Sequence, residues 1–328
     1  MSIFRFWNLL ECTTVDSRHS SRFSVIESAM NLSIDPKVDF AFKLVFGSPE
    51  HTGITIHFLN AVLTLSDPIT SVEILNPICG KDFADDKLVI LDVLARDQAG
   101  RHFNIEMQTS LPTDLPKRLT YYNTLNYRNQ LREGCHYRDL RPAISICVLN
   151  QMLYRNLPNY HLSFRLRCDQ HALVFTDEIV FHTLELPKFN RSKSEISGCS
   201  AIEKWLYFLK YAEQTNAKDL VQHLVDPEFE EAVGVLTMIS KSPEDRQFYE
   251  DRMKFLMDQE GLMIAARMEG MELGIEKGRE EGKLLGQLKV YQQLLGQPET
   301  SSTELQQLSL SELANIIADL QQQLRDRR

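Results

Sequence analysis

Two acidic residues, on what read as neighbouring strands, are the residues of this sequence best placed to do chemistry. Asp92 interrupts the apolar run of residues 88–95, and Glu106 lies in the alternating run of residues 103–108. Both runs have the length and pattern of β-strands. The Gln-Ala-Gly sequence between them suits a three-residue hairpin loop, with Gly100 in the left-handed conformation. The stretch therefore predicts a β-hairpin that carries both acids.

The register of this hairpin decides whether the two acids meet. A hairpin centred near residue 99 pairs residues whose numbers sum to about 198, and Asp92 and Glu106 satisfy that sum. Their Cβ atoms should then lie about 5 Å apart on adjacent strands. Two such acids repel each other unless a cation lies between them, and oxygen ligands suit Mg²⁺ or Mn²⁺. Gln108 is two residues from Glu106 and so points from the same strand face.

A structural role for Asp92 is the alternative that these residues leave open. A single acid in an apolar strand more often has a structural partner or faces solvent than binds a metal. Three coinciding features favour the metal site. They are the acid within the run, the turn midway, and the E-x-Q sequence on the returning strand.

Several segments, taken in order, resemble one family. They are DPKVDFAFKLVFG at residues 35–47, LDVLA at 91–95, NIEMQ at 104–108, the tyrosine pair at 121–122, QLREG at 130–134 and ELPKF at 185–189. With a glycine-spaced helix further on, the ordered set resembles the Rpn family of recombination-promoting nucleases, also described as transposases. That family lies within the PD-(D/E)XK nuclease superfamily. The resemblance covers roughly residues 31–290.

The resemblance implies an α/β (α+β) fold with a restriction-endonuclease-like core, in which helices flank a mixed sheet, followed by a helical C-terminal region. It implies Mg²⁺-dependent hydrolysis of DNA, with Asp92 and Glu106 as metal ligands. Gln108 stands where the wider superfamily has a lysine, and Rpn-like families commonly carry this replacement. An acid on the first helix often supports the metal site, and Asp39 is the matching position. An ordinary salt bridge to Lys43, four residues later, is an equal alternative for Asp39.

A basic and aromatic helix is expected after the hairpin. Residues 111–141 contain six lysines and arginines against three acids, and the expected helix at residues 111–132 mixes its arginines with tyrosines. Such a surface suits a nucleic-acid backbone, although a solvated helix with some tyrosines in the core explains the same pattern. The resemblance also places Gln130 near the active site. The candidates for DNA contact are Lys43, Arg118, Tyr122, Arg128 and Gln130.

The composition restricts the classes of function. The chain has 328 residues and a net charge of −9, with 25% charged and 43% hydrophobic residues, as in a soluble globular protein of about two domains. The negative charge argues against nonspecific nucleic-acid binding by the whole surface. Six scattered cysteines without a C-x-x-C pair indicate reduced thiols and a cytoplasmic protein. No apolar run is long enough to predict a membrane span.

The chain divides into four expected segments. They are an N-terminal extension at residues 1–30, a nuclease-like domain at 31–190, a helical region at 200–295 and a short helical tail at 300–328. We expect the extension to be disordered or to precede a natural start at Met30. Ser309 and Glu312 form a capping box for the tail helix.

Glycine recurs at every fourth residue of the long helix expected near residues 245–295, at Gly270, Gly274, Gly278, Gly282 and Gly286. Each glycine inside a helix costs about 1 kcal/mol relative to alanine. Close packing against another helix would offset this cost, which predicts a homo-oligomer through the Gly270–Gly286 segment. A weakly ordered helical tether is the alternative.

Three functions agree with these patterns. The first is a metal-dependent DNA endonuclease. The second is a noncatalytic DNA-binding or assembly protein on a degenerate nuclease fold, and the third is another metal-dependent hydrolase. The sequence lacks the G-x-x-x-x-G-K-[ST], G-x-S-x-G and H-E-x-x-H motifs, which argues against several other enzyme classes.

Overall fold

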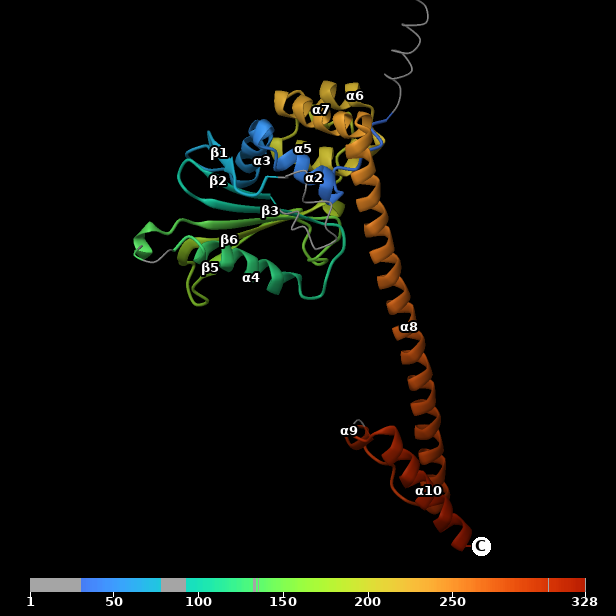
Figure 1. Cartoon of the computed structure of the whole chain (residues 1–328). Coiled ribbons are helices and arrows are strands. Elements are labelled where there is room, and N and C mark those ends of the chain that lie inside the picture. Colours follow the sequence, from blue (N-terminus) through green and yellow to red (C-terminus); the bar gives the residue numbers. More distant parts are fainter. Residues whose placement is uncertain (1–30, 78–92, 132–133, 135, 306, 328) are drawn as a thin grey trace, which may run out of the picture. The chain divides into compact units, whose positions relative to one another are not determined.

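The computed structural model describes residues 31–327 except 78–92, 132–133, 135 and 306 (Figure 1). Contacts within the chain form two compact units, which divide between Lys254 and Phe255. The segment boundaries expected near residues 190 and 300 stay predictions. None of the helices in the described part is both long and apolar enough to cross a membrane.

A six-stranded mixed sheet in the order β1-β2-β3-β4-β6-β5 forms the centre of the first unit. The strands are β1 Val72–Ile74, β2 Val93–Asp97, β3 His102–Gln108, β4 Ala143–Leu149, β5 His161–Arg167 and β6 Val174–Glu185. The β3–β4 and β4–β6 pairs are parallel, and the other pairs are antiparallel. Every residue of β4 is buried, as expected for an apolar strand covered on both faces. The apolar sequence of residues 143–149 is that of a central strand, and β4 lies between β3 and β6.

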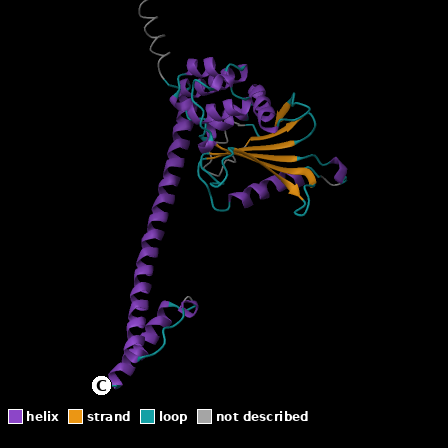
Figure 2. Ribbon diagram, turned by 180° about the vertical axis from the view of Figure 1, so that it is seen from behind, coloured by secondary structure: helices purple, strands orange, loops and turns teal. Residues whose placement is uncertain are grey.

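Helices cover both faces of the sheet (Figures 1 and 2). Helix α4 lies on one face, and the helices on the other include α2, α3 and α5. The α-helices of this unit are α2 Asp39–Phe46, α3 Thr52–Leu63, α4 Leu115–Arg128, α5 Ala201–Tyr211, α6 Ala217–Leu224 and α7 Pro227–Lys241, and α8 Pro243–Leu295 begins in it. Short 3-10 helices occur at Pro49–His51, Tyr137–Asp139, Leu186–Lys188, Ile196–Gly198 and Ala212–Gln214. The predicted mixed sheet flanked by helices, with a helical C-terminal region, is confirmed.

An aromatic cluster holds α2, α3, α5 and α7 together. The ring of Trp205 lies 4.3 Å from that of Phe229 and 5.3 Å from that of Phe46, measured between centroids. All three side chains are fully buried. The indole Nε1 donates to Nδ1 of His57 at 3.0 Å, so the histidine supplies the partner that a buried indole needs. His57 is therefore a structural histidine of this packing.

The Asp35-Pro36 pair is typical of a helix N-cap followed by the first helical residue, but α2 begins three residues later than this predicts, at Asp39. The carboxylate of Asp35 accepts hydrogen bonds from the backbone N–H of Lys37, at 2.9 Å, and from its ammonium, at 2.7 Å. The backbone N–H of Asp35 donates to the hydroxyl of Tyr249 at 2.9 Å. These contacts fix Asp35 in a turn, so it does not cap the helix.

The second unit contains a helical hairpin. Helix α10 (Leu310–Asp326) packs against the C-terminal end of α8, and the short α9 (Ser302–Leu305) lies in the connection. Leu288 and Leu295 of α8 pack with Leu313 and Ile317 of α10. The hydroxyl of Ser309 accepts from the backbone N–H of residue 312 at 3.3 Å, and the carboxylate there accepts from Ser309 N at 2.8 Å. The predicted capping box is confirmed.

Candidate active site on one face of the sheet

The hairpin has the predicted register wherever the structure describes it. Val93 pairs with Ile105 and Ala95 with Phe103, so the numbers of paired residues have the predicted sum. Gly100 has φ +79°, the left-handed conformation expected of it. Asp92 lies outside the described residues, and its position opposite Glu106 stays a prediction.

One buried carboxylate closes the turn of the hairpin. Oδ1 of Asp97 accepts hydrogen bonds from the backbone N–H groups of Ala99, at 3.0 Å, and Arg101, at 2.9 Å. Its Oδ2 accepts from Nε of Arg101 at 2.6 Å. These bonds hold the turn in one conformation, and a turn of fixed length fixes the register of the strands that follow it.

The Glu106 carboxylate lies on β3 between two amide side chains. Nδ2 of Asn104 donates to Oε1 at 3.3 Å, and Nε2 of Gln108 donates to Oε2 at 3.0 Å. Alternate residues of a strand share a face, and these bonds confirm that Gln108 points to the same side as Glu106. The Glu106 side chain is only 3% exposed. A buried carboxylate requires polar partners, and these amides supply two hydrogen bonds to it.

Helix α4 covers the sheet face to which Glu106 points. Leu115 and Leu119 pack against Cys147 and Leu149 of β4, and Cys147 is the neighbour of Glu106 in the β3–β4 ladder. At the other end of the helix, Asn126 Oδ1 lies 3.3 Å from His102 Nδ1, at the start of β3. Helix α4 therefore runs opposite to β3, with its N-terminal half at the level of Glu106. Burial lowers the pKa of His102, which favours its neutral form.

Three buried oxygen atoms near Glu106 have no hydrogen-bond partner among the described residues. They are Asn104 Oδ1, Ser145 Oγ and Thr183 Oγ1. Ser145 is the β4 neighbour of Asn104, and Thr183 follows beyond Cys147 in the ladder from Glu106. An unpaired buried oxygen costs about 1–3 kcal/mol. Bound water or a cation would satisfy these atoms.

None of these three oxygens was predicted from the sequence. Asn104 could have been found, because it precedes Glu106 by two residues and must share its face. Ser145 is an isolated polar residue in an apolar strand, and Thr183 follows His182 in a strand with several polar residues. Their position beside Glu106 depends on the strand order β3-β4-β6, which no local pattern indicates.

Asp39 forms an ion pair with Arg252 and not with Lys43. Arg252 Nε donates to Oδ1 of Asp39 at 3.0 Å, and Arg252 Nη2 contacts Oδ2. The alternative of a salt bridge between Asp39 and Lys43 is therefore wrong, because Arg252 of α8 supplies the cation. A role for Asp39 at a metal stays a prediction. Lys43 is 4% exposed, and this burial does not favour the predicted contact between Lys43 and DNA.

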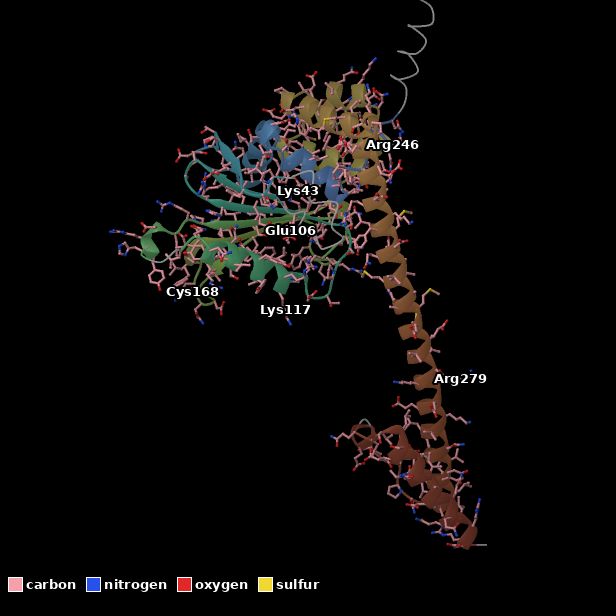
Figure 3. The ribbon with its side chains drawn as sticks, in the orientation of Figure 1. Lys43, Glu106, Lys117, Cys168, Arg246 and Arg279 are labelled. Carbon is pink, nitrogen blue, oxygen red and sulfur yellow. The ribbon has the colours of Figure 1, made fainter. Side chains whose placement is uncertain are left out.

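The outer face of α4 is basic and aromatic. Lys117, Tyr121 and Arg128 are exposed and follow one stripe of the helix, with Arg118 and Tyr122 beside them. The side chain of Lys117 projects away from the sheet that holds Glu106 (Figure 3). No acidic residue occurs between Leu115 and Arg128. Arg118, Tyr122 and Arg128, predicted to contact DNA, thus all lie at the surface.

Gln130 is bound to the loop before β4. Its Nε2 donates to the carbonyl of Arg141 at 3.0 Å, and its Oε1 accepts from the N–H of Arg141 at 2.9 Å. Arg141 precedes Cys147, the neighbour of Glu106, by six residues, which is roughly 20 Å of extended chain. The resemblance implied that Gln130 lies near the active site. The structure does not bring Gln130 to Glu106, because both hydrogen-bonding groups of its amide bind this loop.

A comparison with known protein families identifies the family of this chain. Residues 36–266 match the model of a family described as PD-(D/E)XK nuclease family transposase. The chain belongs to this family. The match spans the hairpin, Glu106, helix α4 and the start of α8. No curated protein and no solved structure was found to match the chain.

In this member of the PD-(D/E)XK nuclease family, the side chains around Glu106 can be compared with the ligands of a metal site. Within them, no three His, Cys, Asp or Glu side chains lie close enough to hold a metal ion. The chemistry of the donor set nevertheless fits a hard cation. It consists of the Glu106 carboxylate and nearby amide and hydroxyl oxygens, which are the ligands that Mg²⁺ and Mn²⁺ prefer.

Proposed function

We propose that this chain is a metal-dependent DNA endonuclease that hydrolyses phosphodiester bonds, with Glu106 and Asp92 as ligands of Mg²⁺. The observation that carries the proposal is the buried Glu106 carboxylate, held by two amide donors on a strand of a PD-(D/E)XK nuclease family protein. The buried oxygens of Asn104, Ser145 and Thr183 near it have no hydrogen-bond partner among the described residues, and a bound cation or water would satisfy them. Mn²⁺ has the same ligand preferences as Mg²⁺ and is an expected substitute.

The protein's own part in the reaction is to orient Glu106 and to position the DNA. A divalent cation bound here would supply an activated water and stabilise charge on the scissile phosphate. Asn104 and Gln108 each donate to one carboxylate oxygen, so they fix its orientation without neutralising its charge. Gln108 stands where the wider superfamily has a lysine. It keeps a hydrogen-bond donor at this position but carries no positive charge. Water activation then depends more strongly on the cation.

The DNA would contact the exposed face of α4 with one flank and present its scissile phosphate to Glu106 past the N-terminal end of this helix. The N-terminal half of this helix lies at the level of Glu106, and Lys117, Arg118 and Tyr121 are exposed there. Basic side chains neutralise phosphates, and aromatic rings stack on bases that leave the duplex. This positive surface is local, since the chain as a whole carries a net charge of −9. Recombination-promoting activity would follow from DNA cleavage.

Cleavage of supercoiled plasmid tests the proposal. We expect the wild-type protein to nick or linearise plasmid with Mg²⁺ and to lose this activity with EDTA. Glu106→Gln and Asp92→Asn remove ligand charge with little change in shape, and each should lower the rate by about two orders of magnitude or more. Glu50→Gln changes an exposed acid on a short 3-10 helix and is the matched control.

Two outcomes would contradict the proposal. Unchanged cleavage by folded Glu106→Gln would show that the activity belongs elsewhere. DNA binding without cleavage, by the wild-type protein as well as by the variants, would favour a noncatalytic DNA-binding or assembly protein. The replacement of the superfamily's lysine by Gln108 supports this alternative. A panel of chromogenic phosphodiesters separates a DNA nuclease from other metal-dependent hydrolases.

A further inference from the structure

The middle of helix α8 exposes many apolar side chains. Every residue from 257 to 283 is exposed in the structure. Among them Met257, Met268, Met271 and Ile275 are each at least 60% exposed. An apolar surface of this extent is unfavourable in water and usually marks a binding surface.

These side chains follow a regular spacing. Eight positions separated alternately by four and three residues carry only methionine, isoleucine or glycine. We call them the seam, and they are Met257, Gly261, Ile264, Met268, Met271, Ile275, Gly278 and Gly282. Ten of the 26 residues from 257 to 282 are charged, yet none of the ten lies in the seam. This period of 3.5 residues is the pattern of a left-handed coiled coil.

No described part of the second unit covers the seam. Helix α10 packs only where the seam has ended, against Leu284, Leu285 and Leu288. No heavy atom lies within 4 Å of a Cβ built on Gly278 or Gly282, apart from the helix's own backbone nearby. The seam therefore has room for another helix.

The seam differs from the glycine stripe expected from the sequence. Of the five regularly spaced glycines, only Gly278 and Gly282 belong to the seam. The other three lie at its flanks or away from it, because a spacing of four residues drifts around a helix of 3.6 residues per turn. The contact surface is thus the apolar row, and three of its layers, at Gly261, Gly278 and Gly282, lack side chains.

We propose that the seam binds the seam of a second copy of this chain in a parallel, in-register coiled coil. Charge complementarity selects this partner. In that arrangement Arg267 of one copy lies beside the partner's Glu272, and symmetry repeats the pair. An antiparallel pairing of the same stretch would instead place Glu260 beside the partner's Glu281, and this repulsion would offset the attraction between Asp258 and the partner's Arg279.

Sedimentation velocity of the full-length chain over a concentration series tests this dimer. Ile275→Glu puts a carboxylate in the seam, and Leu273→Glu puts the same group on the opposite side of the helix. Ile275 and Leu273 are 61% and 50% exposed. We expect Ile275→Glu to weaken dimerisation by about a hundredfold or more, because two carboxylates would be buried together. Leu273→Glu should dimerise like wild type.

A second pair of variants separates the seam from general helix stability. Gly282→Leu and Gly270→Leu both remove a glycine from the helix, and each should stabilise the helix by about 1 kcal/mol. Only Gly282→Leu adds an apolar side chain to the seam, so only it should tighten dimerisation, by about tenfold or more. Circular dichroism verifies that every variant is folded.

Three results would overturn the proposal. The first is a wild-type chain that stays monomeric throughout the series, as it would if its own N-terminal residues covered the seam. The second is equal weakening by Ile275→Glu and Leu273→Glu. The third is a dimer that Gly282→Leu leaves unchanged.

Discussion

At the scale of single residues, two amides of β3 set the orientation of the Glu106 carboxylate. Asn104 donates to one of its oxygens and Gln108 to the other. The buried Glu185, by comparison, has the ammonium of Lys188 at 3.0 Å. A neutral amide adds no positive charge beside a carboxylate, so it opposes metal binding less than a lysine at the same position would.

The buried His182, paired with the half-buried His161, predicts acid sensitivity. Nε2 of His161 lies 2.9 Å from Nδ1 of His182. Burial, with the nearby charges of His161 and Arg165, lowers the pKa of His182 to about 4. Between this value and the usual 6.5 the unfolded chain binds a proton that the folded chain does not. The free energy of unfolding should therefore fall as the pH falls, by roughly 2 kcal/mol between pH 7 and pH 5.

Urea titrations at several pH values check this expectation. Replacing His182 by glutamine should remove most of the fall, because the buried group no longer titrates. The exposed His171 is the matched control, and His171→Gln should keep the wild-type pH dependence. If the free energy of unfolding of His182→Gln falls as much as that of the wild type, groups other than His182 cause the fall.

At the scale of secondary-structure elements, the hairpin turn determines which β3 side chains face α4. Gly100 has φ +79°, and a Cβ there would lie 3.1 Å from Cγ of Arg141. Gly100→Ala should lower the free energy of unfolding by about 1–2 kcal/mol. Gly198 has an ordinary φ and no atom within 4 Å of a built Cβ, so Gly198→Ala should be neutral or slightly stabilising. Chemical denaturation measures both, and equal effects would contradict the prediction.

Helix α4 makes a separate prediction about DNA affinity. Lys117 and Arg118 are exposed on the half of the helix nearest Glu106. Changing both to alanine should weaken DNA binding and reduce the slope of log K against log salt by about 1 for each phosphate that is no longer neutralised. Lys218, exposed on α6, is the site of the control variant Lys218→Ala. Fluorescence anisotropy at several salt concentrations measures the slope, and the same slope for all three proteins would exclude α4 from the interface.

At the scale of the whole molecule, the described residues form two compact units. Ile317 is 4% exposed in the hydrophobic cluster of the second unit. Ile317→Ala should destabilise that unit by about 2–4 kcal/mol through the cavity it leaves. Hydrogen exchange should then increase in residues 310–326 and stay unchanged in β4. Faster exchange in both would mean that the units unfold together.

The sequence alone determined the features that depend on neighbouring residues. The register of the hairpin, the left-handed Gly100, the cap of α10 and the shared face of Glu106 and Gln108 follow from backbone geometry over a few residues. The ordered motifs likewise indicated the nuclease family to which the chain belongs. The helix start at Asp35 is an exception, because the distant Tyr249 helps to hold Asp35 in a turn.

Only the tertiary structure decided which distant residues meet. Arg252 pairs with Asp39 across 213 positions of the chain, and the strand order brings Ser145 and Thr183 beside Glu106. It also decided which part of α8 is covered by α10 and which part stays exposed. The physical reason is that such contacts depend on how elements pack, and many packings satisfy the same local patterns of polarity and turn residues.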